Sequence, residues 1–484
     1  MSTPLSPPSD RMSGRAWGML FVLCGAIFLE GIDVAMLNVA LPSIRSDLDL
    51  STGSLSWVMS SYVLGYGGFM LLGGRAADLL GRRRMFLAWL GVFIVFSGLG
   101  GFATEGWILI LARFVTGVAS AFMAPAGLSI ITTNFAEGPQ RNRALLVYAG
   151  TASAGFSLGL VVGGLLAEIS WRWVFFAPVI MASAVLVAAL VLIPGDDRPH
   201  HHARGFDLAG AVTVTAAMMT LVFAVVRLED PAGEWPWAAG ILTVGVALIA
   251  AFVAIERRSA SPLVRLGILR SGPLVRANLG ALLFGGSFFG FQFLVVLYLQ
   301  ELRGWSSLEA ALALLAVGID AILAPTLTPL LVNRFGNVRV IFGGLCLAVV
   351  AYALFLPIGL DWTYAAMFPT MIILGLGFAL VYGPLTIAAT DGVAEEEQGL
   401  AGGLLYTSFQ FGSALGLSAV TAVHVAATGS DESLLTQLDG FRAALLIPFA
   451  MAAVAAVVIA FGLRGRGGTG TKVRRETPVT VESL

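Results

Sequence analysis

The chain has 484 residues, of which 57% are hydrophobic and only 12% are charged, and its formal net charge is −1. Soluble globular chains carry about 25% charged residues, so this chain has too little charge to cover a water-soluble particle of its length. The composition therefore excludes an ordinary soluble enzyme, a nucleic-acid-binding protein and a disordered protein. It indicates a polytopic membrane protein.

Long apolar runs divide the chain into transmembrane segments. A spanning helix needs about 20 apolar residues, and only helices or closed barrels satisfy their backbone in lipid. The runs are unbroken rather than alternating, so we expect an all-α membrane protein with fourteen transmembrane helices. The predicted spans are Trp17–Ile44, Leu55–Gly73, Met85–Ala103, Trp107–Thr133, Leu145–Ala167, Trp173–Ile193, Leu208–Val226, Trp237–Ile255, Leu279–Leu299, Ala310–Val332, Val338–Ile358, Tyr364–Ala389, Leu400–Ala427 and Ala443–Leu463.

The basic residues fix the predicted orientation. With an even number of spans both termini lie on one side, and the loops and tails of that side hold most of the chain's 28 Lys and Arg residues. Basic loops stay in the cytoplasm, so we expect a multi-pass protein of the cytoplasmic (inner) membrane with both termini inside. Treating Leu208–Val226 and Trp237–Ile255 together as an interfacial hairpin would keep this pattern with twelve spans, but their hydrophobicity favours fourteen.

The spans group into two six-helix halves with two extra central helices. We expect a cytoplasmic tail (1–16), an N-terminal half (17–194), a linker with two extra spans (195–276), a C-terminal half (277–463) and a second cytoplasmic tail (464–484). Asp78 and Gly81 after the second span match Asn333 and Gly336 after the tenth in spacing. Transporters built from parallel repeats show such a pattern and bind substrate near the midplane, between the halves.

Four charged residues stand out because they lie deep inside predicted spans, where a charge costs about 2.5–3.5 kcal/mol on insertion scales. Glu30 and Asp33 share one face of the first helix, Arg113 lies in the fourth span and Asp320 in the centre of the tenth. Counted at about 1.5 Å per residue, Asp33 and Arg113 lie within one helical turn of the same depth, so an ion pair between them is geometrically allowed.

These charges suit a site that couples transport to protons. Burial disfavours an ionised carboxylate and a neighbouring arginine favours it, so an acid exposed to each side in turn can bind and release a proton. Three acids against one base would make a cavity net acidic, which favours cationic or protonatable substrates. The alternative is a static ion pair that only holds the helices together.

Several neutral residues are further candidates. Asn38, Tyr62, Phe289 and Gln292 are candidates for lining a pocket, although Tyr62 would serve equally well as an interfacial anchor and some of the aromatic residues must face lipid. The fifth span carries small-xxx-small rows, which allow close helix packing and sliding during a conformational change. These rows are formed by Gly155, Gly159, Gly163 and Gly164.

The sequence carries no pattern typical of an enzyme or a metal site. Cys24 and Cys346 lie in apolar runs, and His200–His202 cannot all face one ion on a regular element, so we expect a solvated loop there. Nothing resembles a P-loop, a metal cluster or a Ser/His/Asp set. We therefore expect a non-enzyme without cofactor or metal, driven by an ion gradient.

Four segments together resemble the major facilitator superfamily and its fourteen-helix drug:proton antiporter branch. Residues 74–83, with Gly74, Asp78, Gly81, Arg82 and Arg83, are similar to the superfamily's signature loop. The other three segments resemble the first-helix motif of the branch, the fourth-helix arginine motif and the fifth-helix antiporter motif. They are Ile32–Pro42, Arg113–Gly117 and Gly155–Gly164.

The resemblance implies roles for particular residues. In that family the signature loop is a cytoplasmic gate, a role that carries over to Asp78, Arg82 and Arg83. The fourth-helix arginine and the first-helix aspartate are linked to proton or substrate handling, which fits Arg113 and Asp33. An acid in the tenth span helps some members to recognise cationic drugs, and Asp320 stands at that place.

The chain departs from the family pattern at several positions. Leu79, Thr116 and Ala35 replace the usual arginine, glutamine and threonine of their motifs, and Leu160 replaces the proline of the antiporter motif. Proline there would remove a helix hydrogen bond and permit bending. A further group of segments fits the same branch: Trp171–Trp173, Phe206–Gly210 and Gly399–Gly402.

The sequence thus predicts a transporter that exports small amphipathic, cationic compounds in exchange for protons by alternating access. Its expected partners are a small-molecule substrate, protons and the lipid bilayer, with no nucleic acid, and it is expected to function as a monomer. The alternatives are a dedicated exporter of one natural product and a proton symporter for uptake. A receptor or membrane enzyme on such a scaffold is disfavoured because no soluble domain is evident.

Overall fold

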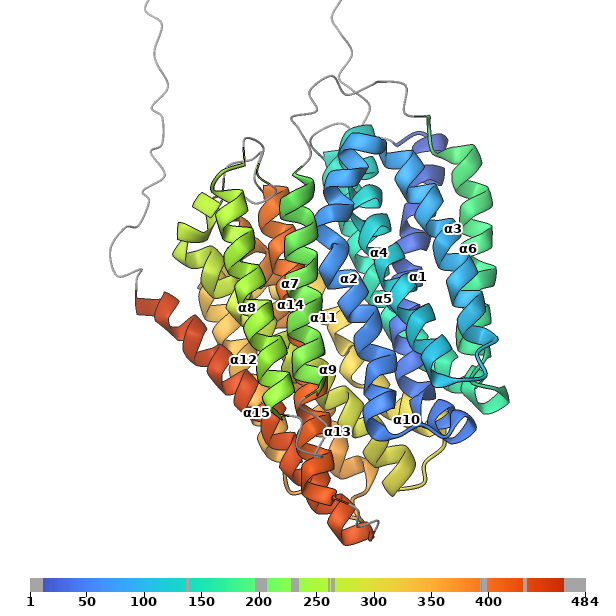
Figure 1. The fold of residues 1–484 in the computed structure, drawn as a ribbon, viewed down its shortest axis with the longest axis vertical. Coiled ribbons are helices and arrows are strands. Elements are labelled where there is room, and N and C mark those ends of the chain that lie inside the picture. Colours follow the sequence, from blue (N-terminus) through green and yellow to red (C-terminus); the bar gives the residue numbers. More distant parts are fainter. Residues whose placement is uncertain are drawn as a thin grey trace, which may run out of the picture.

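The computed structural model describes residues 12–135, 139–195, 207–227, 235–259, 262, 266–391, 393, 398–429 and 433–464. These residues form long helices (Figure 1). The helices are α1 (Gly14–Leu48), α2 (Thr52–Leu80), α3 (Arg82–Gly101), α4 (Gly106–Asn134), α5 (Pro139–Ile169), α6 (Trp173–Leu192), α7 (Leu208–Arg227), α8 (Trp235–Glu256), α9 (Gly272–Leu297), α10 (Ser307–Leu315), α11 (Asp320–Phe335), α12 (Asn337–Phe355), α13 (Tyr364–Thr390), α14 (Gln398–Thr428) and α15 (Leu434–Arg464), with short turns η1 (Leu266–Arg270), η2 (Tyr298–Leu302) and η3 (Val317–Ile319).

The helices begin where the sequence supplies capping groups. The hydroxyl oxygens of Ser13, Ser51 and Ser271 accept hydrogen bonds from the first turns of α1, α2 and α9. Ser306 and Glu309 form a reciprocal capping box at the start of α10. Each such cap satisfies backbone N–H groups that the helix leaves without an internal partner.

The all-α prediction is confirmed, and the count of fourteen spans is consistent with the structure. By length and composition, twelve helical segments of the described chain suffice to cross a membrane. The 29-residue α2 and the 20-residue α7 run beside them in the same bundle (Figure 1). The tenth span differs from the expectation, because α10 and α11 are separated by the turn Val317–Ile319. The predicted histidine loop lies outside the described residues.

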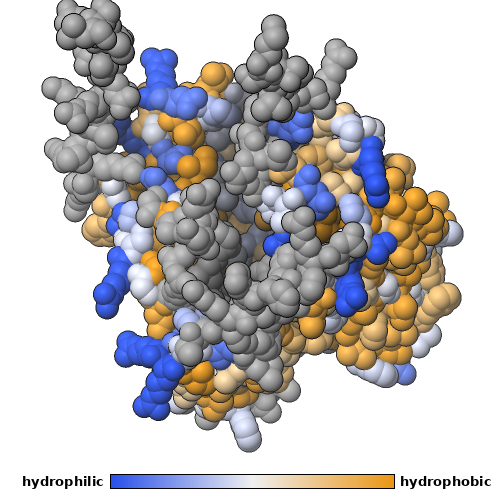
Figure 2. All heavy atoms as spheres, turned by 90° about the horizontal axis from the view of Figure 1, so that it is seen from above, coloured by the Kyte–Doolittle hydropathy of each residue, from blue (hydrophilic) through white to orange (hydrophobic). Residues whose placement is uncertain are grey.

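Helices α1–α6, here called the first half, pack chiefly against one another, and so do α9 and α11–α15, which with α10 are called the second half; α10 itself packs chiefly against α5 of the first half. The helix α7 lies across the seam between α2 and α14 (Figure 1). There the hydroxyl of Thr215 donates a buried hydrogen bond of 2.8 Å to the carbonyl oxygen of Gly68. The flank of the bundle is hydrophobic, whereas hydrophilic side chains gather on the end that faces the viewer in Figure 2. This distribution suits a bundle surrounded by lipid.

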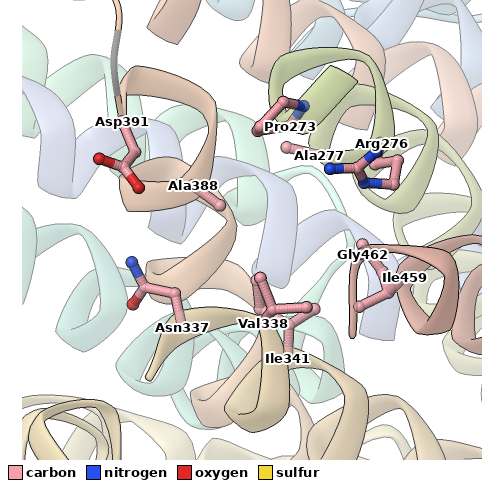
Figure 3. Close-up of a pocket in the computed structure, with 10 residues that line it drawn as sticks. All are labelled: Pro273, Arg276, Ala277, Asn337, Val338, Ile341, Ala388, Asp391, Ile459 and Gly462. Carbon is pink, nitrogen blue, oxygen red and sulfur yellow. The ribbon is translucent and has the colours of Figure 1, made fainter. Parts of the chain in front are cut away.

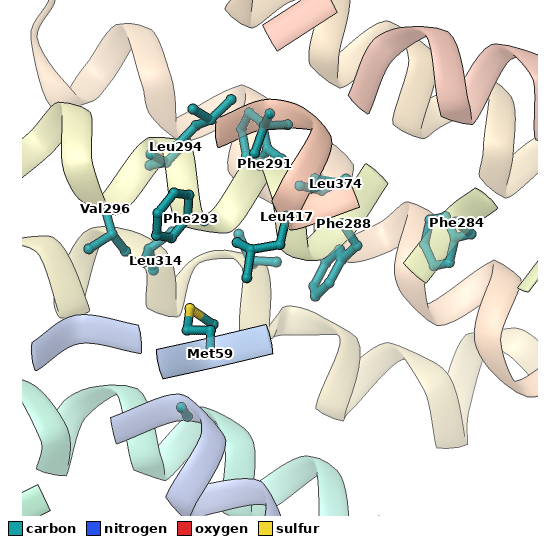
Figure 4. Close-up of a cluster of buried hydrophobic side chains, with 14 of the residues drawn as sticks. Met59, Phe284, Phe288, Phe291, Phe293, Leu294, Val296, Leu314, Leu374 and Leu417 are labelled. Carbon is teal, nitrogen blue, oxygen red and sulfur yellow. The ribbon is translucent and has the colours of Figure 1, made fainter. Parts of the chain in front are cut away.

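The two ends of the bundle are named here by the helix termini that they hold. The tail end holds the starts of α1, α9 and α14 and the ends of α2 and α15; the far end holds the ends of α1 and α5 and the starts of α2 and α10. One apolar cluster, with Phe86 and Met123, belongs to the first half. A larger cluster joins both halves, and in Figure 4 Met59 of α2 lies beside Phe293 and Leu417 of the second half.

Candidate functional site

The centre of the first half holds a buried ion pair. Arg113, about two turns from the start of α4, places Nη1 2.6 Å from Oδ2 of Asp33 on α1, and the two side chains are only 3% and 2% exposed. The depth count from the sequence allowed this pair, and the structure brings the two residues together. A pair this deep is a strong constraint, because removing either partner leaves the other charge buried without compensation.

Tyrosine rings surround this pair. The guanidinium carbon of Arg113 lies 4.3 Å from the centre of the Tyr62 ring, which gives a cation–π contact. The Tyr62 hydroxyl donates to Oγ of Ser120 at 3.0 Å, so the ring is fixed from its other end. Tyr62, a candidate pocket residue, thus lies against the charged pair in the bundle interior rather than at a membrane interface.

Glu30 lies one helical turn from Asp33 but has a different partner. The Tyr66 hydroxyl donates a 2.8 Å hydrogen bond to Oε2 of Glu30, and both residues are buried. The Tyr66 ring in turn lies 5.2 Å from that of Tyr406 on α14. Glu30 is therefore connected to the second half through Tyr66, whose ring contacts that of Tyr406. Sequence reasoning missed Tyr406, since nothing in an apolar run indicates which side faces the other half.

Asp320 stands apart from these residues. It is the first residue of α11, directly after the turn η3, and it is partly buried. A carboxylate in the first turn of a helix is favoured by the helix dipole, so the start of α11 suits an acidic side chain. Among the described residues, no hydrogen bond or ion pair joins Asp320 to Asp33, Glu30 or Arg113.

The candidate pocket residues Asn38 and Gln292 meet between the halves. Nδ2 of Asn38 on α1 lies 3.0 Å from Oε1 of Gln292 on α9, and each residue is 1% exposed. Phe289 is partly buried, and its ring packs against those of Phe288 and Phe409 at 5.6 and 6.1 Å. The four candidates therefore lie in two places. Tyr62 packs against the charged pair, whereas Phe289 and Gln292 lie on α9 and Asn38 of α1 bonds to Gln292.

The halves are joined by polar contacts at the far end. Nη1 of Arg45 lies 2.6 Å from Oε2 of Glu301, and Nε2 of Gln300 donates to the carbonyl oxygen of Val39 at 2.9 Å. The Leu308 amide donates to Oε1 of Glu168 at 3.2 Å. These contacts and the Asn38–Gln292 bond link the two halves through polar groups. All lie toward the far end, so this end is closed.

The glycines of α5 divide between two partners. A Cβ at Gly155, Gly159 or Gly163 would lie within 2.9 Å of α1 atoms, backbone atoms among them. A Cβ at Gly164 would instead lie 2.7 Å from Cβ of Ala311 and 3.0 Å from Cα of Leu308, on α10 of the second half. Close packing is thus the role of the row in this arrangement. Leu160 is 1% exposed in a continuous helix.

The loop that resembles the signature motif forms a tight junction at the tail end. Gly81 joins α2 to α3 with φ 99°, a conformation that side-chain-bearing residues rarely adopt. Nη2 of Arg83 donates to the carbonyl oxygen of Leu190 at 2.8 Å. Gly74 lies in the last turns of α2 and Arg82 opens α3, while the Asp78 side chain lies outside what the structure describes.

The second copy of this loop has the same backbone geometry. Gly336 joins α11 to α12 with φ 81°, at the position that matches Gly81 in the sequence repeat. The repeat is therefore conformational as well as sequential.

Gly81→Ala and Gly336→Ala are each expected to lower stability by about 1–3 kcal/mol, because alanine is strained at a positive φ. Thermal unfolding of the purified protein checks this. Gly343→Ala is the control, since that helical glycine has nothing within 4 Å of its Cβ position, and it should be neutral or slightly stabilising. Equal losses in all three variants would contradict the assignment of strain.

A separate pocket of about 260 Å³ lies at the tail end of the second half. Figure 3 shows that Arg276 of α9, Asn337 of α12 and Asp391 beside α13 surround it. None of the residues singled out from the sequence lines this pocket. It lies inside one half rather than between the two, so it is not the central site.

A bundle of membrane-spanning helices with charged residues paired in its interior defines a multi-pass protein of the transporter class. The family model described as the Major Facilitator Superfamily matches residues 23–417. The chain therefore belongs to the major facilitator superfamily, which confirms the resemblance.

Relatives with known names cover most of the chain. The lincomycin resistance protein of Streptomyces lincolnensis is 35% identical over 413 residues, or 85% of each chain. The cephamycin export protein CmcT of Amycolatopsis lactamdurans is 35% identical over 428 residues, or 86% of this chain and 85% of that protein. Solved structures share the fold. A bacterial homologue of the human lysosomal transporter Spinster, inward-facing and unoccupied, has a TM-score of 0.66 at 16% identity and covers 94% of this chain and 98% of its own.

Proposed function

We propose that this protein exports small amphipathic compounds, cationic ones above all, from the cytoplasm in exchange for protons. The observation that carries the proposal is the buried Asp33–Arg113 pair beside Glu30, in a chain whose relatives include named resistance and export proteins. On this proposal the tail end faces the cytoplasm, the protein works as a monomer in the cytoplasmic membrane, and the proton gradient replaces any cofactor.

The geometry suggests how a proton would act. With Asp33 ionised, its charge and that of Arg113 cancel, and the pair holds α1 against α4. A proton on Asp33 would remove the ionic attraction and leave Arg113 a buried cation that faces only a neutral carboxyl group and the Tyr62 ring. That imbalance favours a different packing of the two helices. Proton binding is thereby tied to a change of conformation, as alternating access requires.

Glu30 and Asp320 are the candidates for contact with a cationic substrate. Arg113 balances one of the three acids, which leaves one carboxylate in each half without a described basic partner. A cation that entered between the halves would meet Glu30 from the first and Asp320 from the second. The proposed preference for cations depends on these two residues.

A narrower function is the second candidate. Several relatives carry the name of one compound, among them the puromycin resistance protein of Streptomyces alboniger, which is 33% identical over 86% of this chain and 83% of its own. A dedicated exporter of one natural product would share the whole site described above. Proton symport for uptake is the remaining alternative, and the sign of proton movement distinguishes it.

The test uses inside-out vesicles with an acidic lumen and a pH-sensitive dye. Cationic, neutral and anionic amphiphiles are added in turn, with vesicles that lack the protein as the control. We expect several cations to collapse the gradient. Equal or better collapse by anions would remove the cation preference. Silence across the panel, with folded protein present, would favour a narrow exporter, and proton movement of the opposite sign would favour symport.

A further inference from the structure

The hydrogen bond between Asn38 and Gln292 joins the two halves inside an apolar layer. Counted from Leu48 on α1 and from Leu302 after α9, both residues lie about 15 Å inside the far end. Their neighbours along the helices, such as Val39 and Phe293, are fully buried apolar residues.

The bond uses only part of what the two amides offer. Oδ1 of Asn38 and Nε2 of Gln292 are buried and have no hydrogen-bond partner among the described residues. Turning both amides over reverses the direction of the bond but leaves the same remainder, one carbonyl oxygen and one NH2 group. Buried polar groups in folded proteins are almost always paired. The fold alone does not explain these two.

Two buried serine hydroxyls that also lack a hydrogen-bond partner lie at a similar depth in the bundle. Ser60 on α2 and Ser418 on α14 are 0% exposed, and neither Oγ has a partner among the described residues. A Cβ at Gly67 would contact the Phe411 ring at 3.5 Å, so positions 67 and 411 of these antiparallel helices face each other. Ser60 lies seven residues from Gly67 on α2, and Ser418 lies seven residues from Phe411 on α14. Both steps lead toward the far end and return to the same helix face, so the two serines lie at one level.

Four unpartnered groups, two from each half, thus lie at one level of the interface. We propose that Asn38 and Gln292 form a neutral subsite for the carboxamide group of a transported compound. This subsite rests on the proposed export function. The ligand N–H would donate to Oδ1 of Asn38, and its carbonyl oxygen would accept from Nε2 of Gln292. The apolar side chains around the pair hold the rest of such a molecule.

The subsite is separate from the charged residues. Asn38 lies five residues beyond Asp33 on α1, about 7.5 Å nearer the far end, so one molecule can place an amine near Glu30 and an amide at this pair. Since the direct bond links the halves, it breaks whenever the far end opens. The subsite is then exposed on the side where an exported compound leaves.

The experiment compares procainamide with procaine, an amide and an ester that otherwise share one structure. Binding to the purified full-length protein in lipid nanodiscs is measured by calorimetry. We expect the wild-type protein to bind the amide about tenfold more tightly, because the ester leaves the carbonyl oxygen of Asn38 unpaired. In Asn38→Leu and in Gln292→Met the ratio should fall close to one.

The matched control is Asn278→Leu, an amide on the same helix whose groups bond to Leu274 and Ser408; it should keep the tenfold ratio. Thermal unfolding accompanies each variant: each single subsite variant should be less stable than the wild type, because it leaves the other amide buried without its partner, and the double variant Asn38→Leu with Gln292→Met should recover most of that loss. An unchanged ratio in a folded subsite variant, or no amide preference in a wild-type protein that exports both compounds, would overturn the subsite alone. Failure of the protein to bind or export either compound would count against the proposed function itself.

Discussion

Arg113→Ala is expected to lower the stability of the protein by about 3–5 kcal/mol and to abolish proton-coupled transport. The substitution leaves the Asp33 carboxylate buried without its partner, and the cost of such an uncompensated charge exceeds the net value of the pair. Asp33→Asn should be milder for folding, because the amide still accepts a hydrogen bond from Arg113. It should nevertheless stop proton coupling, since an amide does not titrate. Thermal unfolding and proton flux in vesicles measure the two effects.

The double variant Asp33→Asn with Arg113→Gln separates structure from mechanism. Two neutral amides restore a hydrogen bond without a buried charge, so most of the lost stability should return while coupled flux stays absent. Asp439→Ala is the control for losing an ion pair as such. Asp439 is 73% exposed and its partner Arg442 is 43% exposed. Removing this ion pair should therefore lower the stability by less than about 1 kcal/mol. Coupled flux that survived in Asp33→Asn would transfer the proton-carrying role to Glu30 or Asp320.

The fold was accessible from the sequence because each span carries its own signal. An apolar run of sufficient length forms a helix in lipid whatever its neighbours do. The break at Val317–Ile319 was missed for the converse reason. Gly318 is a local hint of it, and the α-helix tightens to a 3-10 turn there, where Gly375 of α13 approaches the carbonyl oxygen of Val317. Such a break is imposed by packing and has no periodic pattern.

The site was accessible only in part. Depth along a helix follows from residue counting, which is why Asp33 and Arg113 were expected at one level. The rotation of each helix about its axis does not follow from counting. The bond from Tyr66 to Glu30, the ring of Tyr406 and the pairing of Asn38 with Gln292 all depend on that rotation. Single-sequence reasoning finds which residues are exceptional, whereas the structure shows which of them meet.

Gly164→Val is expected to leave the protein folded but to hold its far end open, with transport reduced about fivefold or more. A side chain at this position collides with α10, which belongs to the other half. The collision is relieved when the halves separate, so the cost falls on the closed state alone. Overpacking of this kind costs about 1–3 kcal/mol, which is about a 5- to 150-fold shift between two conformations.

The neighbouring glycine provides the decisive comparison. A Cβ at Gly163 would lie 2.5 Å from Cα of Met36 on α1, inside the same half. Separation of the halves cannot relieve that collision, so Gly163→Val should lower stability and yield rather than shift the conformation. Gly150→Val, with open space around it, should change neither. The readout is the reaction of a Met59→Cys thiol with a membrane-impermeant reagent, because Met59 is 6% exposed while the far end is closed. Faster labelling only with Gly164→Val would show that this residue acts between the halves, and equal labelling in all three variants would contradict it.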